Sequence, residues 1–327
     1  MKEDEIMCTC LDIKNKNHYF GRTLDLDRHA VEEAVITPRN YLFACKNSLT
    51  FRNKYALIGT AMVINDYPLY YEASNEVGLA MAGLNFPVNC KYNDPQEEKI
   101  NLGVFEIIPY ILGNYASVKE LRKDLERMNF TNVAFIDQLP SSPLHYMISD
   151  KEETIVVEQM EDGLHIYENK VGVMTNNPPF NLQIENLKKY EDLTNKHVFA
   201  SLPSHTCVGL GAVGLPGDFS SMSRFVKASF LRNTASFSLD EEENISTFFH
   251  ILDSVSMIKG TVLNKNEDSD ITFYTSCINT TLGIYYYKTY LNNQINVLRF
   301  TEDNKTNSTL TRFVLVNNQN FNYLNRI

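Results

Sequence analysis

The strand-like stretches of this chain come in clusters separated by short turns, and the helical patterns are grouped between those clusters. Strand patterns follow one another over residues 55–84, 144–175 and 271–300. Consecutive strands joined by short turns pair antiparallel, whereas a parallel sheet alternates single strands with single helices. The sequence therefore predicts an α+β fold in which helical layers cover antiparallel sheets. Periodicity predicts helices at 118–128, 182–193, 223–232 and 243–257.

No linker, low-complexity tract or repeat divides the 327 residues, so we expect one domain over residues 8–327. The formal net charge of −10, with scattered Lys and Arg, argues against a nucleic-acid partner. The longest apolar stretch, 102–118, is interrupted by Glu106 and Pro109 and is too short to span a bilayer. The acidic start lacks the pattern of a secretory signal, which predicts a cytoplasmic protein.

The six cysteines are dispersed, with no CxxC pair and no cysteine–histidine cluster at the spacing of a zinc site. We therefore expect reduced thiols and no metal. A metal site at Cys8 and Cys10 with a remote histidine is the alternative, but no other feature supports it.

Cys8 becomes chemically distinctive if residues 1–7 are removed, or if translation starts at Met7 and that methionine is clipped. The residue then carries a thiol and a free α-amine, whose ordinary pKa values are about 8.5 and about 7.7–8.0. One residue would hold both a nucleophile and a base. The alternative is an ordinary buried thiol.

Arg22 and Asp25 close the first strand-like segment, where the chain could turn back beside Cys8. A guanidinium near a thiol favours the thiolate, and a carboxylate next to an α-amine can orient that amine. Both effects would serve a Cys8 nucleophile. A surface Arg–Asp pair is the alternative interpretation.

Two asparagines end strand-like runs shortly before a proline, and either could stabilise an oxyanion. Asn85 could present its backbone N–H, and Asn176 could offer its side-chain amide. Turn formation explains both equally well. The glycine-rich segment 209–224 lacks the spacing of a P-loop or a dinucleotide site. It could deliver Arg224 from the first turn of the next helix into a pocket, or simply form a close-packed turn.

Together these motifs resemble the choloylglycine hydrolase family, which comprises the bile salt hydrolases and penicillin V acylases. The likeness runs from Cys8 to about Tyr290. The matching motifs are Met7-Cys8-Thr9, Phe20-Gly21-Arg22-x-Leu24-Asp25, Asn75-Glu76-x-Gly78-Leu79, Ala82-Gly83-Leu84-Asn85-Phe86-Pro87, Ser149-Asp150, Thr175-Asn176-x-Pro178 and Gly214-Leu215-Pro216-Gly217-Asp218-x-Ser220-Ser221-x-Ser223-Arg224-Phe225.

The resemblance implies an N-terminal-nucleophile hydrolase, a four-layer αββα sandwich that usually assembles as a homotetramer. The reaction that it implies cleaves an amide: the thiolate attacks, glycine or taurine leaves, and the acyl-thioester is hydrolysed. Neither a metal nor an organic cofactor is needed.

The roles that the resemblance implies fall on the residues already singled out. Cys8 would be the nucleophile and, through its α-amine, the base. Arg22 and Asp25 would tune and orient it, and Arg224 would complete the polar network. The remaining predictions are an oxyanion hole of Asn85 and Asn176, and an apolar groove for the acyl group lined by Leu24, Ile64, Phe135 and Leu139, for which plain core is the alternative.

Three functions stay open at this point. The first is a hydrolase of glycine- or taurine-conjugated bile salts. Asn85 resembles the bile salt hydrolase branch of the family, whereas penicillin V acylases tend to carry tyrosine at this position. The second function is a penicillin V or N-acyl homoserine lactone acylase. The third is an inactive binding protein that keeps its leader, since six residues precede Met7 and the family usually starts at Met-Cys or has a short pro-segment.

Overall fold

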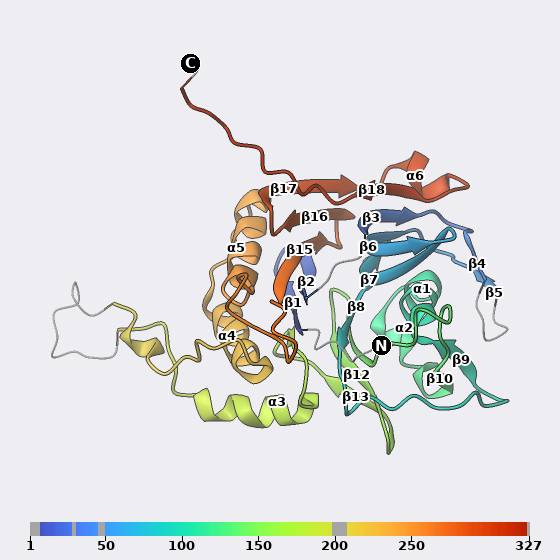
Figure 1. Ribbon diagram of the computed structural model, residues 1–327, viewed down its shortest axis with the longest axis horizontal. Helices are drawn as coiled ribbons and strands as arrows, with labels where there is room; N and C mark the ends of the chain where they lie inside the picture. Colours follow the sequence, from blue (N-terminus) through green and yellow to red (C-terminus); the bar gives the residue numbers. More distant parts are fainter. Residues whose placement is uncertain (1–6, 28–30, 45–49, 198–207, 326–327) are drawn as a thin grey trace.

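Two large antiparallel sheets face each other between two sets of helices in the computed structural model, which describes residues 7–27, 31–44, 50–197 and 208–325 (Figure 1). The six-stranded sheet has the order β14 (Val173–Met174), β1 (Met7–Lys14), β2 (His18–Leu26), β15 (Ile271–Asn279), β16 (Ile284–Thr289) and β17 (Asn292–Arg299). The eight-stranded sheet has the order β13 (Gly163–Glu168), β12 (Thr154–Met160), β11 (Leu144–Ser149), β8 (Ala80–Asn85), β7 (Tyr67–Asn75), β6 (Leu57–Ile64), β3 (Glu32–Thr37) and β18 (Thr311–Val314).

Helices cover the outer face of each sheet, which confirms the predicted α+β fold. The helices over the six-stranded sheet are α3 (Phe180–Leu187), α4 (Ser221–Thr234) and α5 (Glu241–Asp253). Those over the eight-stranded sheet are α1 (Val104–Asn114) and α2 (Val118–Leu121). The remaining elements are β4 (Leu42–Ala44) with β5 (Thr50–Arg52), β9 (Ile100–Gly103) with β10 (Met128–Thr131), the 3₁₀ turns at Leu125–Arg127, Lys188–Tyr190 and Leu210–Ala212, and α6 (Glu302–Thr306).

The buried apolar side chains form two clusters, and strand β8 contributes to both because successive side chains of a strand point to opposite faces. In β8, Ala80, Ala82 and Leu84 pack between the two sheets, whereas Met81 packs in the layer under α1. All four side chains are fully buried. This double burial explains why the strands of the eight-stranded sheet read as nearly continuous apolar runs.

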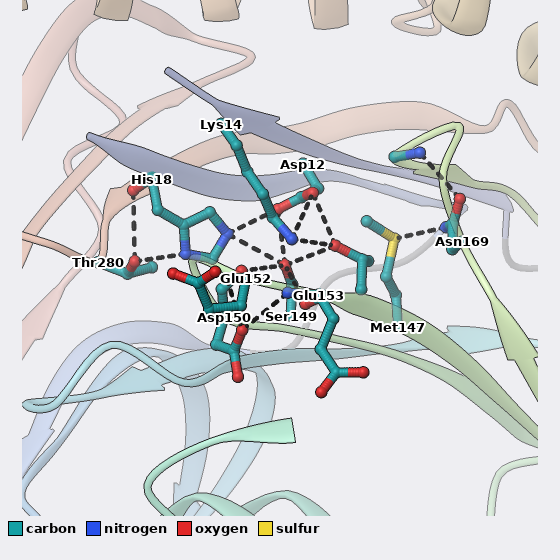
Figure 2. A network of polar contacts seen from close by, with 12 residues as sticks. Asp12, Lys14, His18, Met147, Ser149, Asp150, Glu152, Glu153, Asn169 and Thr280 are labelled. Atoms are coloured by element: carbon teal, nitrogen blue, oxygen red, sulfur yellow. Dashed lines mark hydrogen bonds and ion pairs between the residues drawn. The ribbon is translucent and has the colours of Figure 1, made fainter. Parts of the chain in front are cut away.

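A buried polar network joins the two sheets at the turn of the β1–β2 hairpin (Figure 2). One carboxylate oxygen of Asp12 lies 2.6 Å from His18 Nε2 and accepts from Ser149 Oγ at 2.7 Å. The other oxygen accepts from Thr154 Oγ1 at 2.8 Å, and His18 Nδ1 lies 2.7 Å from Thr280 Oγ1. The network therefore ties β1 and β2 of one sheet to β11 and β12 of the other.

Two helices differ from the prediction. The predicted helix 118–128 ends at Leu121, because Met128 begins β10 and pairs in parallel with Ile100 of β9. Helix α1 lies within the apolar stretch that the sequence left without an element. Pro109 cannot supply the N–H that would bond the carbonyl of Phe105 four residues earlier, and the Tyr67 hydroxyl donates to that carbonyl at 3.4 Å instead.

The strand β18 closes one edge of the eight-stranded sheet. It pairs antiparallel with β3, from Thr311 opposite Ile36 to Val314 opposite Glu33. This strand comes from the end of the chain and was not anticipated from the sequence.

Candidate active site

The β1–β2 hairpin places Cys8 beside the two charged residues predicted to serve it. Cys8 lies opposite Leu24, and Cys10 lies opposite Arg22. Because side chains alternate along a strand, Cys8 and Arg22 point to one face of this sheet and Asp25 points to the other. The chain therefore turns back beside Cys8 as predicted, with the two charges on opposite sides of the hairpin.

Arg22 is buried and fixed by four acceptors. Its Nη2 donates to the sulfur of Cys8, and its Nη1 donates to the carbonyl of Gly83 at 2.6 Å and to that of Tyr71 at 3.3 Å. Its Nε donates to the carbonyl of Thr23 at 3.1 Å. The two longer-range carbonyls belong to β7 and β8, so the guanidinium bridges the sheets and holds its position on the sulfur.

The Cys8 thiol is inaccessible to solvent yet forms part of the wall of a cavity. Burial raises the pKa of this thiol above its ordinary value, although Arg22 and Arg224 both act to lower it. The direction of the Arg22 effect is the predicted one. With residue 7 still attached, however, desolvation outweighs it, because a thiolate loses more by leaving water than the guanidinium returns.

Asp25 lies on the opposite face of the hairpin, where burial raises the pKa of its carboxyl group. Its oxygens accept hydrogen bonds from Thr272 Oγ1 at 2.6 Å and Thr23 Oγ1 at 3.0 Å. The backbone nitrogen of Cys8 donates to Asn176 Oδ1 at 2.8 Å rather than to Asp25. The expectation that Asp25 orients the free α-amine of Cys8 stays a prediction, because with residue 7 attached this nitrogen is a peptide nitrogen whose one hydrogen Asn176 accepts.

Asn176 connects Cys8 with Asn85. Its Oδ1 also accepts from Arg224 Nη2 at 2.8 Å, and its Nδ2 donates to the carbonyl of Asn85 at 2.8 Å. Asn85 is the last residue of β8, and Asn176 follows β14, so the two predicted oxyanion residues meet although they lie 91 positions apart. Asn85 forms part of the cavity wall together with Cys8, and Asn176 accepts from the backbone nitrogen of Cys8.

Arg224 enters the site from the first turn of α4, as predicted from the glycine-rich segment before it. Its Nη1 donates to the carbonyl of Cys8 at 2.5 Å and to Thr9 Oγ1 at 2.7 Å. The N-cap residue Ser220 accepts from the backbone of Ser223 and begins the helix. The guanidinium is buried and holds the main chain of Cys8, while Arg22 holds its sulfur.

A cavity of about 370 Å³ opens in front of the sulfur. Leu24 and Leu139 form part of its wall, as predicted. Its other apolar walls include Leu69, Val104, Phe105, Ile108 and Leu144.

Ile64 and Phe135 do not form part of this wall, which corrects the predicted groove. Met62 does, and Ile64 lies two positions further along β6, roughly 7 Å towards its end. Phe135 packs behind Phe105, with ring centroids 5.5 Å apart, and against Tyr67 at 5.2 Å.

Glu72 is a buried charged residue behind Arg22 that sequence reasoning missed. Its carboxylate accepts from the hydroxyls of Tyr274 at 2.6 Å and Tyr285 at 2.8 Å, and burial raises its pKa. Burial alone would lower the pKa of Arg22, but Cys8, Tyr274 and Glu72 together raise it. A glutamate inside an otherwise apolar strand was the available signal.

Four cysteines, Cys8, Cys10, Cys90 and Cys277, are free thiols, and Cys45 and Cys207 lie outside the described residues. Among the residues that the structure describes, no three His, Cys, Asp or Glu side chains gather as a metal site would need. Over the same residues, no helix is long and apolar enough to cross a membrane.

Comparisons with known proteins place these observations in a family. The family model for linear amide C–N hydrolases of the choloylglycine hydrolase family matches residues 8–312. The bile salt hydrolase/transferase of Lactiplantibacillus plantarum is 40% identical over 314 residues, which cover 94% of this chain and 97% of that protein. The bile salt hydrolase/transferase of Clostridium perfringens is 36% identical over 329 residues, which cover 98% of this chain and 100% of that protein.

A solved structure is similar to this chain over its whole length. The crystal structure of a variant of conjugated bile acid hydrolase from Clostridium perfringens matches with a TM-score of 0.90 at 36% identity. The match covers 97% of this chain and 100% of that one. The two sheets and their flanking helices are therefore those of a bile acid hydrolase structure.

Proposed function

This chain belongs to the choloylglycine hydrolase family of linear amide C–N hydrolases, and from this premise we propose that it hydrolyses the amide bond of glycine- or taurine-conjugated bile salts. The observation that carries the proposal is the Cys8 sulfur, which is held by the Arg22 guanidinium at the wall of an apolar cavity. A rigid, apolar acyl group suits such a wall, and the charged glycine or taurine would extend from it.

The first step is the exposure of the α-amine of Cys8, through removal of residues 1–7 or through translation from Met7. The amine takes the proton of the thiol, and the Arg22 guanidinium stabilises the thiolate that forms. Burial raises the pKa of the thiol, so the thiolate needs a base close by. The α-amine of the same residue is that base, and the proton passes to it rather than to water.

The thiolate then attacks the amide carbon, and negative charge develops on the carbonyl oxygen. The backbone N–H of Asn85 and the side-chain amide of Asn176 are the donors for that oxyanion. The C–N bond breaks, and the leaving amine takes the proton from the ammonium of Cys8. The α-amine of Cys8 then deprotonates a water molecule. This water hydrolyses the thioester and releases the bile acid.

The side chains of Arg224 and Asp25 support this sequence from the side of the hairpin that carries Thr9 and Thr23. Arg224 fixes both the carbonyl of Cys8 and Oδ1 of Asn176, so that nucleophile and oxyanion donor share one anchor. Asp25 lies beside Thr23 and Thr272 on the same side of the hairpin as Arg224, and its charge stabilises that guanidinium.

The test begins with the mass of the purified protein, comparing the full chain with a version whose translation starts at Met7. Mature protein should begin at Cys8 and release glycine from glycocholate or taurine from taurocholate. A protein that retains Met7 has no free amine on Cys8, and the inactive binding protein would then be the correct interpretation. Cleavage of penicillin V alone, with both bile salts left intact, would overturn the proposal in favour of a penicillin V acylase.

We extend the proposal to a homotetramer in the cytoplasm, acting as a single domain over residues 8–327 without metal or organic cofactor. Light scattering of the mature protein tests the assembly. Activity that survives dialysis against a chelator tests the chemistry.

A further inference from the structure

The two asparagines assigned to the oxyanion hole come from distant segments, and one buried residue contacts the neighbour of each. That residue is His145 in β11, which is 1% exposed. Since β11 pairs antiparallel with β8, His145 lies opposite Leu84, next to Asn85. Its ring stacks on Phe86, the residue after Asn85, with centroids 4.3 Å apart and planes 3° from parallel.

The same ring reaches the other asparagine through Thr175. His145 Nε2 lies 2.8 Å from the carbonyl of Thr175, the residue before Asn176. A carbonyl can only accept, so Nε2 donates. His145 thus packs on one oxyanion segment and hydrogen-bonds the other.

Glu158 completes the arrangement from the neighbouring strand β12. Its Oε1 lies 2.9 Å from His145 Nδ1 and accepts from the backbone N–H of Phe180 at 3.0 Å. Glu158 is fully buried, and Phe180 is the first residue of α3. The segment that holds Asn176 is therefore fastened at its start by His145 and at its end by Glu158.

We propose that His145 and Glu158 are a positioning pair that sets Asn176 against Asn85 in the oxyanion hole. The proposal rests on the proposed function. Neither residue forms part of the cavity wall, and the His145 ring makes its polar contacts with Glu158 and Thr175, so the pair does not touch the reacting atoms. It acts through Asn176, whose amide stands 2.8 Å from the carbonyl of Asn85.

The physical basis is the steep dependence of oxyanion stabilisation on donor geometry. A donor must stand about 2.7–3.1 Å from the place where the charged oxygen forms. Without the pair, the carbonyl of Thr175 and the N–H of Phe180 lose buried partners, and the segment between them can move. Such a shift weakens binding of the transition state more than binding of the substrate.

The test uses the double variant His145→Phe with Glu158→Gln. Phenylalanine keeps a ring to stack on Phe86, and glutamine keeps an acceptor for Phe180 without leaving an unpaired buried carboxylate. We expect kcat to fall about 10- to 100-fold, less than the loss of a whole donor, while KM changes less than about twofold. His145→Gln retains a donor for Thr175 and should lose far less.

A transition-state analogue separates positioning from general damage. An aldehyde that replaces the scissile carbonyl adds the Cys8 thiol and forms an oxyanion-like hemithioacetal. Its affinity should fall by the same factor as kcat/KM, whereas the free bile acid should bind as to wild type. Equal losses for both ligands would overturn the proposal.

His18 provides the matched control, because it is also a buried histidine whose ring has polar partners, here Asp12, Ser149 and Thr280, between the sheets (Figure 2). His18→Phe should lower stability but leave kcat per folded molecule unchanged, with folded sites counted by thiol alkylation. A double variant at His145 and Glu158 with wild-type kcat, or a control that loses as much kcat, refutes the pair. Wild-type protein that cleaves no bile salt refutes the proposed function instead, and the comparison is then made on the amide that it does cleave.

Discussion

The two ends of the β1–β2 hairpin both bury polar side chains between protein layers, yet they use them differently. At the turn, Asp12 is surrounded by donors from His18, Ser149 and Thr154. At the open end, two guanidinium groups hold Cys8, one at its sulfur and one at its carbonyl. The first arrangement balances a negative charge, and the second collects positive charge around a group that must become negative.

This difference shows how one hairpin can serve cohesion and chemistry at once. The network at the turn lowers the pKa of Asp12: burial alone would raise it, but the hydrogen bond and charge of His18, with Lys14 and Ser149, outweigh that effect. At the open end, burial prevails and the pKa of the Cys8 thiol is raised. We expect substitutions at the turn to change stability, and those at the open end to change turnover.

The largest effect should come from the nucleophile. Cys8→Ala should abolish release of glycine or taurine, since no other group lies where the sulfur meets the cavity. Cys8→Ser should be severely impaired, because an alkoxide forms far less readily near neutral pH. Circular dichroism should show both variants folded. Ordinary turnover in either would refute the assignment of Cys8.

Asp12→Ala should produce the opposite pattern. Removing one partner of a buried charged pair costs about 3–5 kcal/mol of unfolding free energy. Urea denaturation at pH 7 measures this loss, and turnover per folded molecule should stay near that of wild type. A large loss of turnover without a loss of stability would contradict the proposed difference between the turn and the open end of the hairpin.

The stability contributed by Asp12 should also depend on pH with a defined sign. Because its pKa is lowered in the folded protein, the contribution is complete above the unfolded value of about 3.9 and is lost as pH falls through the folded value. The difference in unfolding free energy between wild type and Asp12→Ala should therefore narrow as pH falls from 5 to strongly acidic solution. A difference that stays constant would contradict the lowered pKa.

Asn176→Ala should reduce kcat by about 10²–10³, because it removes an oxyanion donor. It also removes the acceptor shared by the Cys8 nitrogen and Arg224. Asn85→Ala is the control, since the proposed donor there is the backbone N–H, which alanine retains. Equal losses in the two variants would show that Asn85 acts through its side chain.

The smallest effect should come from the rim of the turn network. Lys14 is 23% exposed in its side chain and donates to Thr154 Oγ1 at 2.8 Å, with its Nζ 3.7 Å from Asp12. Partly exposed pairs of this kind contribute about 0.2–1 kcal/mol. Lys14→Ala should lower the unfolding free energy measured in urea by no more than this, and a loss as large as that of Asp12→Ala would mean that the network depends on Lys14.

Sequence reasoning located the site well where a single turn brings its residues together. Cys8, Arg22 and Asp25 lie within one hairpin, so a short turn was enough to bring their two strands together, with Arg22 on the face of Cys8 and Asp25 on the other face. Asn85, Asn176 and Arg224 are separated by long stretches of chain, and only the ordered set of family motifs predicted that they would meet.

The predictions failed where the decisive contacts cross between elements. Ile64 has an apolar side chain in the right strand, but nothing local tells how far along β6 the cavity extends. The predicted helix 118–128 has good helical periodicity, yet pairing of Met128 with β9 ended it early. His145 lies in β11, but its partners Phe86, Glu158 and Thr175 lie on other segments, so its proposed role could not be predicted from the local sequence.

The pairing of β18 with β3 has a consequence for how this protein is tagged and truncated. Under the proposed mechanism the front end must finish as a bare amine, so a purification tag belongs behind the last residue. A truncation that removed Thr311–Val314 would leave the backbone of β3 as an open strand edge, ready to recruit strands from other molecules. Trimming there should yield aggregates even though the catalytic hairpin is untouched.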